Sequence, residues 1–282
     1  MIKVMTDTGG GLSQALTAQH DIQRIPLLVM FGTDTLRDGV DISSEAFLQR
    51  LKTSKEFPKT SQPPVGDFAT AFKQQLDAGH DVLCITISSL LSGTYNSAAT
   101  ARQQLGDEAA GRIALVDSKS AATGQALIVL EAARLAHAGQ PLPDILARLR
   151  TLIAGMRLEL TVDTLEYFVK GGRLSGAQGF VGTLLQLKPV LTIRDCRLEP
   201  LERIRTKAKA VARLYEIADA TLSGKRGARI GVLHAGIPAE AEAMAARLRD
   251  AYRPEECVVL DLAPAVSAHT GPGAIGIAYY AD

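Results

Sequence analysis

Hydroxyl side chains gather in the stretch SSLLSGTYNSA, residues 88–98, which holds five serine and threonine residues around one glycine. The apolar run before this stretch predicts a buried strand, and the run after it predicts a helix, so Ser92, Gly93 and Thr94 should lie where the helix begins. Unpaired backbone N–H groups and the helix dipole favour an anion at such a position. The stretch therefore indicates an anion-binding turn, although ordinary helix capping would explain any single hydroxyl.

Two other stretches carry side chains of similar chemistry. Thr60 and Ser61 precede two prolines in KTSQPP, where they either contact a ligand or only shape a turn. His269 lies in AHTGPG, and the glycines and proline that follow it predict a rigid loop that could hold one imidazole against a ligand. In an α/β fold, Thr60 and Ser61 should lie close to residues 88–98, at the carboxyl ends of the strands.

These residue types leave three kinds of site open. The first is a binding site that holds an anion and performs no chemistry. The second is a serine hydrolase with Ser92 as nucleophile, His269 as base and Asp7 or Asp117 as the orienting acid, although the sequence contains no G-x-S-x-G motif. The third is a site for a small phosphorylated or keto substrate, because hydroxyls at a helix start also suit phosphate.

The elements that must position these side chains follow from the hydrophobic pattern. The first half of the chain alternates short β-branched runs with longer amphipathic runs that end in glycine. We predict strands at residues 2–7, 25–31, 81–88 and 112–118, and helices at residues 43–52, 65–79, 94–106 and 124–139. Strands that alternate with helices predict an α/β fold with a largely parallel sheet, covered on both faces.

The pattern changes near Gly155. A glycine-rich break at residues 164–176 is followed by two predicted strands that meet at Asp195–Cys196, and then by a long helix at residues 206–224. This hairpin is typical of an α+β domain. We therefore predict an N-terminal α/β domain at residues 1–155 and a C-terminal α+β domain at residues 156–282.

Composition narrows the class of protein. Thirty-one Lys and Arg residues against 30 Asp and Glu give a net charge of +1, so no long-range field favours nucleic acid. The first residues lack the pattern of a secretory signal, and no apolar run approaches the roughly 18 residues of a membrane span. The three cysteines are widely spaced, which predicts neither disulfides nor a metal site. We expect a soluble, cytoplasmic protein without a cofactor.

Several motifs together resemble those of the DegV family. They are TDT near the start, PKTSQPP, ISSLLSGTYNSA, VDSKSAATGQ, LEYFVKGGRLSG, KPVLTIRD, RIRTKAKA and AHTGPGAIGIAYY, and their order along essentially the whole chain is that of the family. The resemblance implies a two-domain α/β protein that binds one long-chain fatty acid between its domains. It also implies that the carboxyl group meets Thr60, Ser61, Ser92, Gly93, Thr94 and His269.

The resemblance further implies a lipid carrier rather than an independent enzyme. Such a carrier presents the bound carboxyl to a separate ATP-dependent subunit of a bacterial fatty acid kinase, and touches a membrane transiently to exchange lipid. We expect Arg173 and Arg205 to meet the kinase or the acyl phosphate, because the arginine fork suits phosphate. A solvated helix start would also explain Arg205. The apolar residues 179–193 are candidates for the wall of the lipid tunnel, and core packing explains them equally well.

Overall fold

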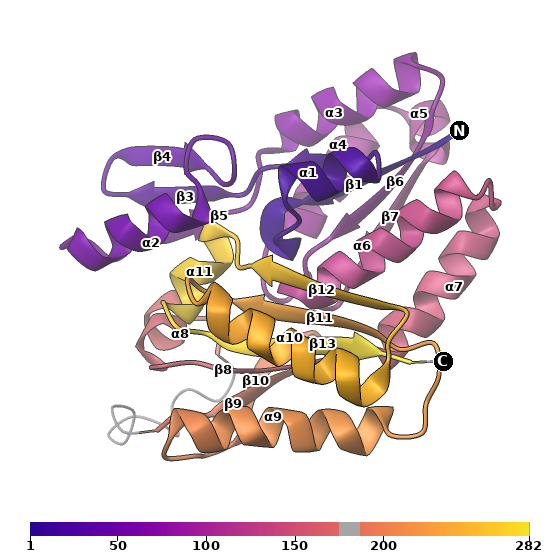
Figure 1. Cartoon of the computed structure of the whole chain (residues 1–282). Coiled ribbons are helices and arrows are strands. Elements are labelled where there is room, and N and C mark those ends of the chain that lie inside the picture. The colour runs from indigo at the N-terminus through magenta and orange to yellow at the C-terminus, as the bar shows by residue number, and fades with distance from the viewer. Residues whose placement is uncertain (175–186, 282) are drawn as a thin grey trace.

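The computed structural model describes residues 1–174 and 187–281 as a mixed α/β fold with two larger sheets and one small sheet (Figure 1). The first sheet has the strand order β2-β1-β6-β7 and is parallel throughout. Its strands are β1 (Ile2–Asp7), β2 (Gln23–Ile25), β6 (Asp81–Thr86) and β7 (Ile113–Asp117). The parallel α/β sheet expected from the alternating pattern is confirmed.

Short helical elements connect and cover this sheet. They are the 3-10 helix η1 (Thr8–Gly10) and the helices α1 (Gln14–Gln19), α3 (Val65–Asp77), α4 (Thr94–Gln104) and α5 (Asp107–Gly111). Two phenylalanines of α3, Phe68 and Phe72, are completely buried and pack with Val82 and Cys84 of β6. Cys84 is thus a small buried residue, as the apolar run around it suggests.

A second sheet has the order β10-β9-β8-β13-β11-β12, in which only β11 and β12 are parallel neighbours. Its strands are β8 (Arg157–Thr161), β9 (Val190–Arg194), β10 (Arg197–Glu202), β11 (Arg229–His234), β12 (Glu256–Asp261) and β13 (Ile275–Tyr280). Asp195 and Cys196 form the turn between β9 and β10, both with positive φ, which confirms the predicted hairpin.

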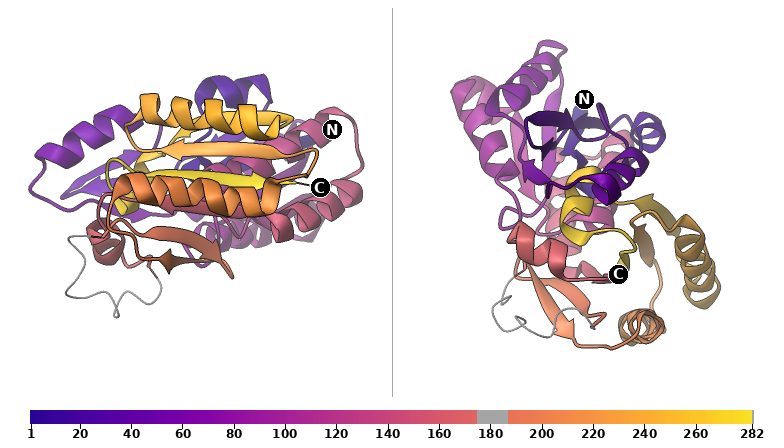
Figure 2. Two further views of the ribbon diagram at one scale, coloured as in Figure 1. Left: turned by 60° about the horizontal axis from the view of Figure 1, so that its bottom comes forward. Right: turned by 90° about the vertical axis from the view of Figure 1, so that its left-hand side faces the viewer.

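Helices cover both faces of the six-stranded sheet. Helices α9 (Lys207–Leu222) and α10 (Pro238–Tyr252) pack on its outer face, as Figure 2 shows. On the inner face lies α6 (Ala122–His137), which contacts β11 and β13 of this sheet and β1 of the parallel sheet, while α7 (Leu142–Gly155) packs beside α6. Every residue from Ala122 to Ala133 is buried, as expected for a helix enclosed on all sides.

The small antiparallel sheet was not predicted. It has the order β4-β3-β5, and consists of β3 (Leu28–Phe31), β4 (Asp34–Arg37) and β5 (Lys59–Ser61), with α2 (Ser44–Thr53) between β4 and β5. The single strand predicted at residues 25–31 is wrong, because the chain leaves the parallel sheet after Ile25 and enters the small sheet at Leu28. Pro26 lies at the break, and it has no N–H group to continue a ladder.

Two short helices complete the fold, and both differ from the prediction. Helix α8 (Glu166–Gly171) occupies the segment predicted as a glycine-rich break, and α11 (Pro264–Thr270) contains His269, which was predicted in a loop. Gly271 and Gly273 have positive φ and end α11, so the rigid turn begins just after the histidine instead of around it. Within the described residues, no helix combines the length and the apolar character needed to cross a membrane.

Candidate functional site

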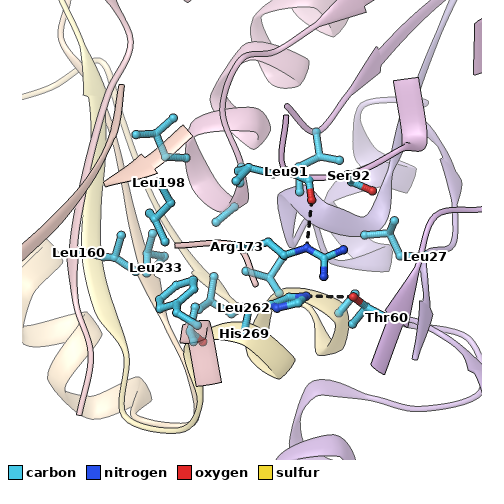
Figure 3. Close-up of a pocket in the computed structure, with 18 of the residues that line it drawn as sticks. Leu27, Thr60, Leu91, Ser92, Leu160, Arg173, Leu198, Leu233, Leu262 and His269 are labelled. Carbon is cyan, nitrogen blue, oxygen red and sulfur yellow. Dashed lines mark hydrogen bonds between the residues drawn. The ribbon is translucent and has the colours of Figure 1, made fainter. Parts of the chain in front are cut away.

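A largely apolar cavity lies between the parallel sheet, the small sheet and the inner face of the six-stranded sheet (Figure 3). The space between its walls amounts to about 790 Å³, including the part open to solvent. Its apolar lining consists of Leu27, Ile87, Leu91, Ala121, Ala122, Leu158, Leu160, Phe168, Ile193, Leu198, Leu233, Leu262, Ala265 and Val266. The polar lining residues are Thr60, Ser61, Gln62, Ser92, Arg173, His269 and Thr270.

The period of a β-strand explains how one sheet supplies an apolar wall. Successive side chains of a strand point to opposite faces, so Leu158 and Leu160 of β8 enter the cavity while Glu159 points toward the outer face. Leu233 at the end of β11 and Leu262 just after β12 extend the same wall. In Figure 3, Leu160, Leu198 and Leu233 lie on one side of the cavity, and Thr60 and Ser92 lie on the other.

His269 and Thr60 make the central polar contact. The Nε2 atom of His269 lies 2.9 Å from the Oγ1 atom of Thr60, although the two residues are 209 positions apart in the sequence. Burial, and to a smaller extent the charge of Arg173, lowers the pKa of His269 to about 4. The imidazole is therefore neutral at pH 7, and one ring nitrogen can donate a hydrogen bond while the other accepts one.

The other ring nitrogen of His269 faces helix α8. Its Nδ1 atom is buried and has no hydrogen-bond partner within the described parts of the chain. A Cβ atom added to Gly171 would lie only 2.1 Å from Nδ1, so the glycine allows α8 to approach the ring closely. The imidazole is thus held between Thr60 on one side and the backbone of α8 on the other.

Ser92 and Thr94 form the second polar group. The Oγ atom of Ser92 lies 2.8 Å from the Oγ1 atom of Thr94, the first residue of α4, and Gly93 is the N-cap residue of that helix. A Cβ atom at Gly93 would lie 3.1 Å from the side chain of Gln62, so a larger residue would press on the neighbouring loop. The predicted anion-binding turn therefore adopts the expected helix-start geometry.

The predicted site residues differ in their position relative to the cavity. Thr60, Ser61, Ser92, Arg173 and His269 line the cavity, whereas Gly93 and Thr94 support Ser92 from behind without lining it, as far as the described residues show. Arg173 donates from Nε to the carbonyl of Leu91 at 3.4 Å and lies beside the polar end of the cavity (Figure 3).

Arg205 lies apart from this group. It is exposed in the segment between β10 and α9, and it does not belong to the described lining of the cavity. Lys207, the first residue of α9, turns inward instead, donates to the carbonyl of Gly273 and lies near Asp163 and Glu240. Of the predicted tunnel residues 179–193, Ile193 lines the cavity, and residues 179–186 lie outside the described residues.

Two buried aspartates behind the cavity were missed as structural supports. Asp7 accepts hydrogen bonds from the N–H groups of Gly9 and Ile87 and from Gln125. Asp38 accepts from the N–H group of Ala265. Burial raises the pKa of Asp7, and it raises the pKa of Asp38 to about 7. Asp7 ends a strand, and the sequence pattern points to it only as an orienting acid, while Asp38 lies in a polar turn with no distinguishing pattern.

The hydrogen bonds do not form a hydrolase triad. Within the described residues, the hydroxyl of Ser92 bonds with Thr94 and the imidazole of His269 bonds with Thr60. Asp7 is bonded to backbone N–H groups and Gln125, and Asp117 accepts from the backbone of Ser89 and Lys119. In the described part of the chain, no cluster of three or more His, Cys, Asp and Glu side chains is placed to hold a metal ion.

Comparisons with known proteins agree with the resemblance seen in the motifs. The family model described as "Uncharacterised protein, DegV family" matches residues 1–282. A DegV domain-containing protein of Deinococcus radiodurans is 35% identical over 278 residues, which cover 98% of this chain and 97% of the relative.

Solved structures show the same fold. The structure of a fatty-acid-binding DegV family protein from Thermus thermophilus matches with a TM-score of 0.91 and 35% identity, covering 100% of this chain and 99% of that one. A stearic acid-binding protein from Eubacterium ventriosum matches with a TM-score of 0.90 and 28% identity, covering 100% and 98%. The chain belongs to the DegV family.

Proposed function

We propose that this chain binds one long-chain fatty acid in the cavity between the sheets. The observation that carries the proposal is the separation of chemistry within the cavity: apolar side chains make up most of its wall, and the hydroxyls of Thr60 and Ser92 with the imidazole of His269 lie together at one end. A fatty acid has the same division between tail and carboxyl group. Two structural neighbours are fatty-acid-binding proteins, which supports the proposal.

The carboxyl group in this proposal lies at the polar end. Ser92 and Thr60 each offer a hydroxyl that can rotate to donate, and neutral His269 can donate from Nε2 or accept from Thr60. The N-terminal end of α4 adds a partial positive charge near Ser92. Ser61 lies beside Thr60 on β5 and contributes a further hydroxyl to the same end.

The tail supplies most of the affinity. Burial of about fourteen methylene groups at ~0.8 kcal/mol each gives a gross gain of roughly 11 kcal/mol before the cost of association. The polar residues therefore fix the position and direction of the lipid. A small phosphorylated or keto substrate fits less well, because it would leave the leucine-rich part of the wall without a partner.

Binding can be tested with delipidated protein. Native mass spectrometry of the purified chain should reveal a bound acid, and adding a long-chain fatty acid after lipid removal should raise the melting temperature, because the ligand binds only the folded state. Ser92→Ala should weaken binding by roughly 1–3 kcal/mol, the cost of one lost buried partner, whereas Ser89→Ala in the same loop should leave it unchanged. No stabilisation by any acid from about ten carbons upward would refute the proposal.

We further propose that the chain presents the bound carboxyl to a separate ATP-dependent kinase subunit, and that it meets membranes only briefly to exchange lipid. Two positions support the first part. Arg173 lies beside the polar end of the cavity, where a phosphoryl group would be added, and Arg205 projects from an exposed segment on the same chain. An exposed arginine is well suited to contact a partner or a phosphate.

Charge reversal at Arg205 tests the contact with a kinase. Arg205→Glu should leave fatty-acid binding intact, because the residue is outside the described cavity lining, and should slow phosphorylation of the bound acid by a cognate kinase at least tenfold, about 1.4 kcal/mol. Arg226→Glu, on another exposed segment, serves as the matched control. Equal phosphorylation rates in all three proteins would remove Arg205 from the interface.

A further inference from the structure

Both ends of helix α11 are bonded to the small sheet or to the residue that directly follows its strand β4. Thr60, on β5, bonds through Oγ1 to Nε2 of His269 in the last turn of α11 at 2.9 Å. Asp38, the residue after β4, accepts through Oδ2 from the N–H group of Ala265 in the first turn at 3.0 Å. Ala265 and His269 are four residues apart, so the two contacts hold α11 at points about one helical turn apart.

Helix α11 needs an acceptor from elsewhere at its N-terminal end. Its N-cap residue is Ala263, which has no side-chain oxygen, and Pro264 at the first helical position has no N–H group. The N–H group of Ala265 is therefore one of the unsatisfied donors of the first turn, and the carboxylate of Asp38 satisfies it from a different part of the chain.

Asp38 itself is held rigidly. Only 1% of its surface is exposed, its backbone N–H group donates to the carbonyl of Leu27 at 2.8 Å, and the hydroxyl of Thr8 donates to its side chain. The charged groups that act on it are Arg24, which favours the carboxylate, and Asp7, which disfavours it. A buried carboxylate with fixed partners is a firm point of attachment for a helix of seven residues.

We propose that Asp38 is the positioning residue for His269: it fixes the first turn of α11 against the small sheet, so that the imidazole in the last turn meets Thr60 and the ligand carboxyl. Asp38 does not touch the ligand in this arrangement. It acts through the helix, and its effect on binding should depend on the presence of His269.

A double-mutant cycle measures that dependence, and for this readout the inference rests on the proposed function. Fatty-acid affinity is measured for Asp38→Ala with His269 present and in a His269→Ala background. We expect the affinity to fall about tenfold in the first case, the scale of one lost hydrogen bond, and less than about twofold in the second. Asp41→Ala is the control, because Asp41 lies in the same turn but pairs with Arg37 at the surface.

A second readout needs no ligand. The ring signals of His269 in the lipid-free protein, followed by NMR over a pH titration, should show its pKa moving toward the ordinary value in Asp38→Ala, because a loosened α11 exposes the ring to water. If the wild type binds no fatty acid, the proposed function fails, but this comparison still decides the role of Asp38.

The outcomes separate positioning from general stability. A purely structural role would reduce affinity equally in both backgrounds and leave the His269 titration unchanged, and either result overturns the inference. If Asp38→Ala does not fold, Asp38→Leu replaces it, since its side chain fills a similar volume but offers no acceptor to the N–H group of Ala265. A loss of affinity confined to the protein that contains His269 then supports the inference, and an equal loss or no loss contradicts it.

Discussion

The neutral imidazole of His269, beside the hydroxyl of Thr60, determines how the polar end of the cavity can interact with an anion. An imidazolium would attract a carboxylate strongly, but burial next to Arg173 lowers the pKa of His269 to about 4, so the ring carries no charge at pH 7. The site therefore offers hydrogen bonds rather than an ion pair at this residue. For the proposed ligand, such bonds favour a defined orientation of its carboxyl group and cost less desolvation than a buried charge.

The lowered pKa of His269 has a consequence for stability. Between its value of about 4 in the folded protein and 6.5, the unfolded chain binds a proton that the folded protein does not, so stability falls as the pH drops through this range. His269→Gln should lose roughly 2 kcal/mol less stability than the wild type between pH 7 and pH 4.5. Chemical denaturation at the two pH values measures this difference.

Asp38 acts in the opposite direction, because its raised pKa of about 7 makes the folded protein bind the extra proton. Comparing His269→Gln with the wild type cancels that contribution. His137→Gln, at an exposed helix end, is the control and should follow the wild type. Parallel pH profiles for His269→Gln and the wild type would show that His269 is not the group responsible.

At the scale of elements, one buried glutamate joins α6 to the six-stranded sheet. Glu131 on α6 pairs with Arg134, with Arg148 on α7 and with Arg229 on β11. Burial raises the pKa of Glu131, but the charge of Arg229 and the hydrogen bonds from Arg148 and Arg134 outweigh burial and hold the pKa below its ordinary value. The carboxylate is therefore ionised and central to this contact.

Removing the charge of Glu131 should loosen this contact. Glu131→Gln is expected to lower the free energy of unfolding by roughly 1–3 kcal/mol, because it removes the charge that the arginines share, while Arg134 and Arg229 keep Glu256 and Glu255. Glu216→Gln, which removes an exposed carboxylate paired with Arg213, should cost less than about 1 kcal/mol. Urea denaturation of both variants provides the measurement, and equal losses would mean that Glu131 adds nothing beyond a surface pair.

Elements with a strong period were predictable, and those set by tertiary contacts were not. The buried strands β1, β6 and β7 and the long helices follow from local pattern alone. The strand that carries Thr60 is only three residues long and is formed by pairing with Val29 of β3, so no local period announces it. The role of Asp38 cannot be read from local pattern either, because Asp38 bonds to a residue that lies 227 positions away in the sequence.

The expectation of a fatty acid came from the resemblance to the DegV family and not from the spacing of the residues. The spacing of serines, threonines and glycine indicated an anion at Ser92, but it did not distinguish a carboxylate from a phosphate. His269 was predicted in a rigid loop and lies instead in a helix that is too short to show a hydrophobic period. The missed support from Asp38 has no signal in a single sequence.

At the scale of the whole molecule, the strands before Gly155 and those after it belong to different sheets, but both sets share one hydrophobic core. One hydrophobic cluster includes Val4 of the parallel sheet, Leu127 of α6 and Leu233 of the six-stranded sheet. The predicted boundary between residues 155 and 156 therefore separates the sheets while it cuts through shared packing. A domain that folds alone needs its own core.

A fragment of residues 1–155 should accordingly fail to fold stably, because α6 would expose the face that packs on β11 and β13. The whole chain should unfold in one cooperative transition, seen as coincident curves by circular dichroism and tyrosine fluorescence. Limited proteolysis and NMR of the fragment complete the test. A well-dispersed spectrum from residues 1–155 would instead establish two independent domains.

The position of β13 in its sheet has a consequence for synthesis. This strand lies between β8 and β11, although in sequence it follows every other strand of the sheet. During translation, the sheet that walls the cavity must wait with a gap at its centre until residues 275–280 have left the ribosome. The cavity wall formed by Leu158, Leu160 and Leu233 on the neighbouring strands can therefore reach its final arrangement only after that last strand is inserted.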